Sequence, residues 1–535
     1  MRVRLISIFR AFKVDIPLYI NVPSLELVYP LSGAKCLYQL HSLYNQAPKK
    51  VILYEKQYNK ASKSVHWTAK RYASASGHRE EKMKIIIIGD GKVGFSLAEN
   101  LSKENHEITI IDKNMDTLKK TIEFLDVMCI CGNGVSTSIL IEAGVNTADL
   151  LIAATSLDEM NMVCCLTAKK LGVKHTVARI RDTQYADELS QLTTDLGLDM
   201  VINPERALAS EISRMLQFPP AIDVETFARG RVEMIEIKVT GSMDIVNMAI
   251  KNIAKKYFQS ILIAAILRNT QAIIPNGDVI IHEGDSIYIV GVPARIFDFC
   301  KKLGLHMNKI KSCMIMGGGR VSYYLAKYLD EIGMKVKIIE INRQRCEELG
   351  AGLPSALIIH GDGSDDMLLK SERISDMDAF ISVTGHDEDN LMSALLAKQA
   401  GVHKVIAKIS RLSYSKIIRN MGVDNLVDPK STITNDIIRF VRGLKNATGN
   451  HVKTLYQIVD GQVEALEFFV GSNAKIVDIP LKRLELKPGV LIAAITRGEN
   501  DTIIPHGNDK IQAGDNVIVV TRNKTFYDLN DIIAD

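Results

Sequence analysis

The chain has 535 residues, of which 47% are hydrophobic and 24% are charged, and its formal net charge is +4. This length is sufficient for about three or four globular domains, and the composition is that of a folded protein. No apolar run reaches the roughly 18–20 residues that a membrane-spanning helix needs, so we expect no transmembrane segment.

The spacing of cysteine and histidine gives no indication of a metal centre or of a disulfide framework. The eight cysteines include no C-x-x-C pair, and the histidines are scattered. This usage is typical of a reducing cytosol in which thiols pack as small apolar groups. We therefore expect no structural zinc site.

Residues 1–82 differ from the rest of the chain. They contain fourteen Lys and Arg but only five Asp and Glu, so residues 83–535 carry a formal charge of −5 and give no reason to expect nucleic-acid binding. Three interpretations stay open. The interpretation that we favour is that translation begins at Met83. The second is that residues 1–82 are a basic targeting segment, and the third is that they form a disordered or partner-binding arm.

The residues from Met83 to Gly94, MKIIIIGDGKVG, predict a buried strand, a glycine turn and a helix over Phe95 to Leu101. In such a turn Gly89 permits the tight bend, and Gly91 lets a pyrophosphate approach the backbone. Gly94 lets the helix pack closely on the strand, and the helix N-terminus favours a bound phosphate. The motif therefore predicts a dinucleotide site.

An acidic residue follows at the distance that this motif requires. The predicted second strand, His106 to Ile111, ends in Asp112, eighteen residues after Gly94. A carboxylate at this point would hydrogen-bond the ribose hydroxyls and repel a 2′-phosphate, which favours NAD(H) over NADP(H).

Strands and helices then alternate as far as about residue 204. The expected helices cover Met115–Leu125, Ser136–Ala143 and Asn161–Leu171, and the expected strands cover Val127–Ile130, Leu150–Ala154 and Thr176–Ile180. This order predicts a doubly wound parallel sheet, in which ligands bind at the carboxyl ends of the strands. Four further polar side chains fall at such ends: Asn133, Thr155, Ser156 and Arg179.

A smaller mixed module is expected over about residues 223–304. Met234–Val239, Ser260–Leu267 and Ser286–Val290 are typical of strands, and Ile245–Ile253 is expected to form a short helix. The module contains no recognisable nucleophile, metal cluster or carboxylate pair, so we interpret it as a binding or dimerisation lobe.

The second half of the chain repeats the first. The glycine turn recurs as KSCMIMGGGRVS from Lys311 to Ser322, and Glu340 takes the place of Asp112. The small module recurs too, because the segments ILIAAI and IIPNG at 261–277 match VLIAAI and IIPHG at 490–507. The duplication is unambiguous.

These duplicated motifs, together with the T-x-x-D-E-x-N segments at residues 155 and 384, resemble the TrkA family of bacterial Trk potassium-uptake regulators. Members of that family contain two tandem RCK/KTN units, each a Rossmann lobe followed by a small C-terminal lobe. The resemblance implies a cytoplasmic regulator, peripheral on the inner face of the membrane, that forms a homo-oligomeric gating ring, such as a tetramer, under a TrkH-type potassium channel. It also implies regulation by NAD(H) or by ATP and ADP.

The resemblance assigns one nucleotide site to each Rossmann lobe. The first site comprises Gly89, Asp90, Gly91, Lys92, Val93, Asp112, Thr155, Ser156 and Arg179. The second comprises Gly317, Gly318, Gly319, Arg320, Val321, Glu340, Thr384 and Lys408. Because Ser322 replaces the third glycine and a lysine replaces the arginine, we expect a different affinity or nucleotide preference at the second site.

The expected fold is α/β, with two tandem Rossmann-like parallel sheets, each followed by a small α+β lobe. The expected boundaries are 83–205, 222–305, 311–430 and 447–531. Two other functions remain open: an NAD-dependent oxidoreductase and a soluble nucleotide sensor without a channel. The pair Tyr323 and Lys327 imitates a dehydrogenase acid/base pair, but we expect two neighbours on one helical turn and no enzyme activity.

Overall fold

The computed structural model describes residues 82–182, 197–257, 261–305, 308–410, 418, 421–423, 425–445, 452–459, 461–499, 501–523 and 526–534. All of them belong to one unit, Glu81–Asp535. The three interpretations of the N-terminal segment fall outside the described residues.

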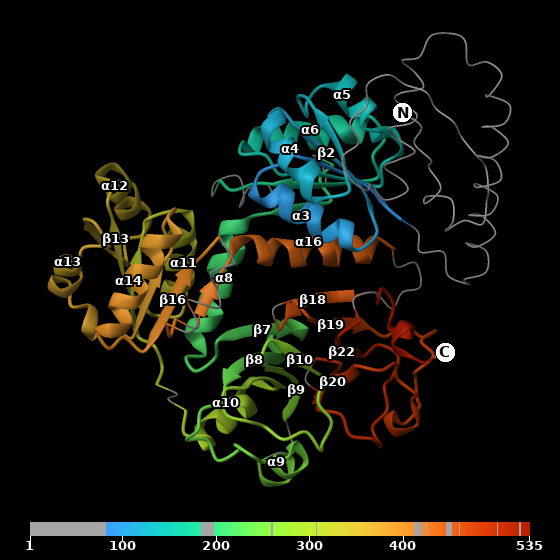
Figure 1. The fold of residues 1–535 in the computed structure, drawn as a ribbon, viewed down its shortest axis with the longest axis vertical. Coiled ribbons are helices and arrows are strands. Elements are labelled where there is room, and N and C mark those ends of the chain that lie inside the picture. Colours follow the sequence, from blue (N-terminus) through green and yellow to red (C-terminus); the bar gives the residue numbers. More distant parts are fainter. Residues whose placement is uncertain are drawn as a thin grey trace, which may run out of the picture. The chain divides into compact units, whose positions relative to one another are not determined.

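The first lobe, coloured blue to teal in Figure 1, contains a parallel six-stranded sheet. Its strand order is β3-β2-β1-β4-β5-β6. Its strands are β1 (Lys84–Ile88), β2 (Glu107–Asp112), β3 (Met128–Cys131), β4 (Leu150–Ala153), β5 (His175–Arg179) and β6 (Met200–Ile202). The isoleucines of β1 are almost fully buried, as expected for a central parallel strand covered on both faces. This strand order is that of a Rossmann fold, which confirms the predicted fold class.

Four helices accompany this sheet: α3 (Lys92–Lys103), α4 (Met115–Phe124), α5 (Thr137–Glu142) and α6 (Asp158–Lys170). Two of them begin earlier than expected. Helix α3 starts directly at the glycine turn, and α6 starts three residues before the predicted Asn161. The early start of α6 places Asp158 and Glu159 in its first turn, where acidic side chains interact favourably with the helix dipole.

Helix α8 (Pro204–Gln217) leads to a five-stranded antiparallel sheet in the order β10-β9-β11-β8-β7. Its strands are β7 (Asp223–Phe227), β8 (Val232–Lys238), β9 (Ile261–Arg268), β10 (Gln271–Ile273) and β11 (Ser286–Gly291), and its helices are α9 (Ile250–Tyr257) and α10 (Pro293–Lys302). The helix expected over 245–253 begins only at Ile250. The preceding residues form turns, and Asn247 has a positive φ of 62° that no α-helix accommodates.

The second half repeats both sheets with the same strand order, so the duplication in sequence is also one in structure. The parallel sheet has the order β14-β13-β12-β15-β16-β17 and the antiparallel sheet the order β18-β19-β22-β20-β21. The parallel strands are β12 (Ser312–Met316), β13 (Lys335–Glu340), β14 (Leu357–His360), β15 (Ala379–Ser382), β16 (Lys404–Lys408) and β17 (Asn425–Val427). The helices are α11 (Arg320–Glu331), α12 (Arg343–Gly352), α13 (Asp366–Ser371), α14 (Asp387–Gln399) and α16 (Pro429–Lys445). The antiparallel strands are β18 (Val452–Ile458), β19 (Val463–Phe469), β20 (Val490–Arg497), β21 (Asp501–Ile503) and β22 (Asn516–Thr521).

The two halves exchange one helix each. Helix α8 follows the first parallel sheet, yet its apolar residues belong to the core of the second lobe, where they pack against α11. Helix α16 follows the second parallel sheet, yet its apolar residues belong to the core of the first lobe, beside α3. The glycine-turn helices α3 and α11 are therefore each covered by a helix from the other half of the chain.

The two antiparallel sheets pack on each other through one shared core. The alanines of the repeated segments, Ala264 and Ala265 in β9 and Ala493 and Ala494 in β20, are fully buried in it. Small side chains let the two backbones approach closely. The resulting interface holds the two halves together far from the glycine turns.

Candidate functional site

The first glycine turn joins β1 to α3. Gly89 has a φ of 98°, which favours glycine, and its N–H donates to the Ile111 carbonyl oxygen at 2.8 Å. A Cβ atom at Gly94 would lie 1.8 Å from the carbonyl oxygen of Gly89, so only glycine fits there. A Cβ atom at Gly91 would meet no atom within 4 Å. The turn therefore leaves open space directly at the N-terminus of α3.

The acidic residue at the end of β2 is fixed beside this turn. Asp112 accepts hydrogen bonds from the N–H groups of Asp90, at 2.7 Å, and Asn114, at 2.8 Å. No side chain caps the N-terminus of α3, so its first N–H groups stay available to an anion. A carboxylate and a helix N-terminus thus lie side by side, as a nucleotide's ribose and phosphates require.

A buried asparagine joins the ends of β4 and β5. Asn161 accepts hydrogen bonds from the backbone N–H of Thr155, at 2.8 Å, and from its hydroxyl, at 2.7 Å. Its amide donates to the carbonyl oxygen of Arg179 at 2.8 Å. The loop Thr155–Ser156 is therefore held at the same sheet edge as the glycine turn. The Thr155 hydroxyl helps to hold it there through its hydrogen bond to Asn161.

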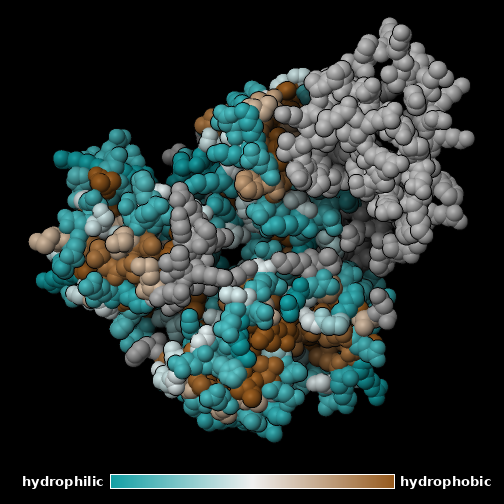
Figure 2. All heavy atoms as spheres, in the orientation of Figure 1, coloured by the Kyte–Doolittle hydropathy of each residue, from teal (hydrophilic) through white to brown (hydrophobic). Residues whose placement is uncertain are grey.

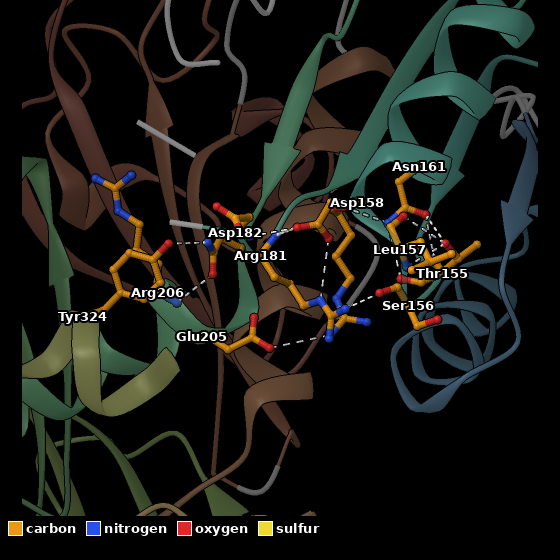
Figure 3. A network of polar contacts seen from close by, with 12 residues as sticks. Thr155, Ser156, Leu157, Asp158, Asn161, Arg181, Asp182, Glu205, Arg206 and Tyr324 are labelled. Carbon is orange, nitrogen blue, oxygen red and sulfur yellow. Dashed lines mark hydrogen bonds and ion pairs between the residues drawn. The ribbon is translucent and has the colours of Figure 1, made fainter. Parts of the chain in front are cut away.

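The loop also contacts an arginine that follows β5 (Figure 3). The guanidinium of Arg181 donates to the carbonyl oxygen of Ser156 and lies 3.7 Å from Asp158 Oδ1. Asp158 Oδ2 accepts the backbone N–H groups of Arg181 and Asp182, both at 2.8 Å. Arg181 is therefore tied to the segment from Ser156 to Asp158.

The second glycine turn joins β12 to α11 in a similar way. Gly317 has a φ of 97°, and a Cβ atom at Gly319 would meet no atom within 4 Å. Ser322, in place of the third glycine, is fully buried and donates its hydroxyl to the Gly317 carbonyl oxygen. The serine thus makes a hydrogen bond where Gly94 makes a van der Waals contact.

The remaining residues of the second turn repeat the first arrangement. Glu340 accepts the N–H groups of Gly318, at 2.6 Å, and Asn342, at 2.7 Å. Asn390 accepts the Thr384 hydroxyl at 2.8 Å and donates to the Lys408 carbonyl oxygen at 3.0 Å. Glu340, Thr384 and Lys408 line a cavity of about 540 Å³ together with Gly317, Gly318, Gly319, Arg320, Val321 and Glu205.

Side chains from one half of the chain reach the site of the other. Glu205, at the start of α8 and labelled in Figure 3, lines the second cavity, and its carboxylate lies 3.8 Å from the Arg179 guanidinium of the first site. Burial is the largest cause of the lowered pKa of Arg179, and the charge of Arg320 on the second turn lowers it further. Burial likewise lowers the pKa of Lys408, and Lys92 on the first turn adds to the shift. The two sites therefore face each other closely enough to interact electrostatically.

The structure brings the predicted residues together in two groups, one at each parallel sheet. Val93 and Val321 contribute backbone at the helix starts, because their side chains are buried, and the Asp90 side chain is buried too. Sequence reasoning missed Glu205 as a lining residue and Asn161 and Asn390 as the residues that tie the loops. The duplicated T-x-x-D-E-x-N segments were the signal for the asparagines, whereas Glu205 depends on the helix exchange.

The described part of the chain contains neither a metal-binding cluster nor a membrane-spanning helix. In that part, no group of three or more His, Cys, Asp and Glu side chains could hold a metal ion. None of the described helices is both long and apolar enough to cross a membrane.

Comparison with known families matches both halves of the chain. The TrkA-N domain model matches residues 85–204 and 313–429, and the TrkA-C domain model matches residues 234–304 and 465–534. Each glycine turn therefore lies in a TrkA-N domain and each antiparallel sheet in a TrkA-C domain.

Individual relatives cover most of the chain. The Trk system potassium uptake protein TrkA homolog 1 of Methanosarcina mazei is 37% identical over 445 residues, which is 82% of this chain and 97% of the relative. TrkA of Vibrio alginolyticus is 34% identical over 449 residues, which is 83% of this chain and 97% of the relative. Among solved structures, the GsuK channel has a TM-score of 0.56 at 16% identity and covers 83% of this chain and 77% of its own. A GsuK channel bound to NAD has a TM-score of 0.55 at 16% identity and covers 92% and 87%. With tandem TrkA-N and TrkA-C domains and relatives of this similarity, the chain belongs to the TrkA family of Trk-system potassium uptake proteins.

Proposed function

We propose that this chain is the cytoplasmic regulatory subunit of a Trk-type potassium uptake system and that NAD(H) or adenine nucleotides, bound at its two glycine turns, control transport. The observation that carries the proposal is the repeated placement of an uncapped helix N-terminus beside a fixed carboxylate. Membership of the TrkA family supplies the transport context.

The residues present fit a nucleotide at each turn. The open space at Gly91 and Gly319 lets a diphosphate approach the backbone, and the first N–H groups of α3 and α11 would receive it. Asp112 and Glu340 would bind the ribose hydroxyls and disfavour a 2′-phosphate. Their placement favours NAD(H), ADP or ATP over NADP(H) at both sites.

The cationic side chains at the carboxyl edge of each parallel sheet would bind the negatively charged phosphates of the nucleotide. In the first site we assign Arg179 this role, with Lys92, Thr155 and Ser156 at the same edge. In the second site, Arg320 and Lys408 take it, with Thr384 beside them. Bound anions would also relieve the repulsion between the cations of the two sites, so each site is expected to sense whether the other is filled.

Exposed apolar side chains support assembly into a homo-oligomeric ring. Val163 on α6 and Met392 on α14 occupy equivalent positions in the two lobes and are 43% and 58% exposed. Apolar residues gather on one face of the second lobe in the space-filling view (Figure 2). We propose that these faces contact other copies of the chain and that a TrkH-type membrane subunit binds the assembled ring at the inner face of the membrane.

We further propose that the chain catalyses no reaction. Tyr323 and Lys327, which imitate a dehydrogenase pair, lie on successive turns of α11, and the Lys327 ammonium lies 4.7 Å from the Tyr323 ring centroid. Such a cation–π contact stabilises a helix and needs no substrate. The oxidoreductase and the channel-free sensor are the alternatives that an experiment has to separate.

The test is rubidium uptake by vesicles that contain a TrkH-type membrane subunit and the purified full-length chain. NAD⁺, NADH, ADP or ATP is added to wild type and to Gly91→Ala and Gly319→Ala, which place a methyl group in the open space without a clash. We expect a nucleotide-dependent change in uptake that the double variant loses.

Three outcomes would contradict the proposal. Uptake that responds equally in wild type and in the double variant would show that nucleotides act elsewhere. Oxidation of NADH by the chain with a small aldehyde or keto acid would favour the oxidoreductase. Uptake that never depends on the chain would favour the channel-free sensor.

A further inference from the structure

The two glycine turns differ in their second residue and in the side chains that this residue contacts. In the first turn this residue is Asp90, and the positions facing it are Thr121 in α4 and Cys129 in β3. In the second turn the corresponding residues are Gly318, Leu349 and Ile358. A Cβ atom at Gly318 would lie 2.5 Å from Leu349 Cδ1, so leucine fills the space that the Asp90 side chain takes in the first turn. An ionisable side chain thus lies under the first glycine turn, and an apolar side chain lies under the second.

Asp90 is a buried carboxyl group with one unsatisfied oxygen. The residue is 2% exposed, and Oδ2 accepts the Thr121 hydroxyl at 2.6 Å. Oδ1 is buried and has no hydrogen-bond partner among the described residues. Because an unpaired buried charge is costly, this environment favours the protonated form.

Burial and the neighbouring carboxylate of Asp112 both disfavour the charge of Asp90, whereas the Thr121 hydroxyl stabilises it. From β2 the carboxylate of Asp112 lies close, since it accepts the Asp90 N–H at 2.7 Å, and from β3 the thiol of Cys129 faces it. Burial is the largest cause of the raised pKa of Asp90, the Thr121 hydrogen bond opposes it, and the Asp112 charge raises it further. Burial and the Asp90 charge raise the pKa of Cys129 to about 11, so the thiol stays neutral. The cation at the start of α3, Lys92, is exposed to solvent.

We propose that Asp90 is a specificity-determining residue of the first site: its ionised carboxylate favours the less negatively charged nucleotide, and it takes up a proton when a more anionic nucleotide binds. The inference rests on the proposed nucleotide binding at this turn. An ionised Asp90 would repel a diphosphate held at the same turn, and the repulsion grows with the ligand's negative charge. At high pH the first site should therefore bind NAD⁺ more tightly than ADP, whereas protonation of Asp90 reduces this difference in affinity.

The second site serves as an internal reference. With Gly318 in place of the carboxyl group, its affinity should not depend on a proton at this position. Glu340 and Asp112 are held by equivalent hydrogen bonds, so they affect both sites alike. Any proton linkage found only at the first site would therefore point to Asp90.

Calorimetric titration of the full-length Gly319→Ala chain with NAD⁺ and with ADP reports the first site alone. Each titration is run between pH 5 and pH 8 in two buffers that differ in ionisation enthalpy, which gives the number of protons taken up. We expect uptake that is larger for ADP and an ADP affinity that falls as pH rises, by about tenfold for each unit by which binding raises the Asp90 pKa.

Asp90→Asn keeps the shape of the side chain and can still accept the Thr121 hydroxyl. It should reduce the proton uptake on ADP binding to the value found at the second site, and strengthen ADP binding at pH 8 relative to NAD⁺. If this variant does not fold, the double change Asp90→Gly and Thr121→Leu, which copies the second site, should have the same effects. The Gly91→Ala chain, which keeps only the second site, is the matched control and should show only the proton linkage of the ADP phosphate itself, whose last ionisation has a pKa of about 6.

The outcomes separate this inference from the proposed function. Nucleotide binding with equal proton uptake in the presence and absence of the Asp90 carboxyl group would overturn the role of Asp90 alone. Binding without any uptake between pH 5 and pH 8 would do the same. Failure of wild type to bind any nucleotide at either site would overturn the proposed function and this inference together.

Discussion

Replacement of Arg442 by methionine is expected to destabilise the junction between the two halves. Arg442 is fully buried in α16, the helix that the second half contributes to the first lobe. Its guanidinium donates to Glu464 of β19 at 2.7 and 3.0 Å and to Glu104, just after α3, at 3.3 Å. Burial alone would lower the pKa of Arg442, but the charges of Glu464 and Glu104 raise it well above its usual range. One cation therefore connects three elements.

The expected cost follows from what methionine leaves behind. Side chains of Glu464 and Glu104 are 0% and 9% exposed, so both carboxylates would lose their cation in a buried place. Removal of one partner of a buried ion pair costs about 3–5 kcal/mol. Replacement of all three residues, as Arg442→Met with Glu464→Gln and Glu104→Gln, removes the unpaired charges and should recover most of this loss.

The assay is hydrogen exchange of α16 peptides together with urea unfolding followed by far-UV circular dichroism. The exchange measurement is needed because a chain of several lobes does not unfold in two states. Gln217→Met is the matched control, since Gln217 holds the position of Arg442 in α8. The reasoning is refuted if Arg442→Met costs less than about 1 kcal/mol, or if the triple variant is as unstable as the single one.

Two further predictions concern the glycine turn and a buried acid. Gly94→Ala forces a methyl group against the Gly89 carbonyl oxygen, so this variant should have a lower melting temperature and no nucleotide binding at the first site. Gly91→Ala should also abolish binding at the first site, but without lowering the melting temperature. Nucleotide binding by Gly94→Ala at the first site with wild-type affinity would contradict this prediction. Burial, and secondarily the Asp223 charge, raise the pKa of Glu211 from 4.5 to about 7, so the folded state holds this proton more tightly than the unfolded state. Stability should therefore fall as pH rises from about 4.5 to about 7, and Glu211→Gln should reduce that slope in urea midpoints measured across this range; an unchanged slope would contradict it.

Local sequence patterns predicted much of the fold, because each strand, turn and helix is encoded within a few residues. The isoleucines before Gly89 require a buried strand, and the recurrence of the turn at Gly317 implies a second copy of the same sheet. The register of the duplicated motifs then placed Asp112 and Glu340 at corresponding strand ends. These positions agree with the structure.

The exchange of α8 and α16 could not be predicted from the sequence. Both helices have an apolar stripe, and a stripe shows that a face is buried but not which lobe buries it. Glu205 in the second cavity and Arg442 in the first lobe are consequences of this exchange. The asymmetry at Asp90 was visible as a residue difference, but its burial and its contact with Thr121 required the structure.

The most direct test of the account is the number of nucleotides that each chain binds, measured by calorimetric titration of the full-length protein with ADP. We expect two sites per wild-type chain, one after Gly91→Ala or Gly319→Ala, and none in the double variant. An unchanged number of sites in the double variant would show that the glycine turns do not bind the nucleotide.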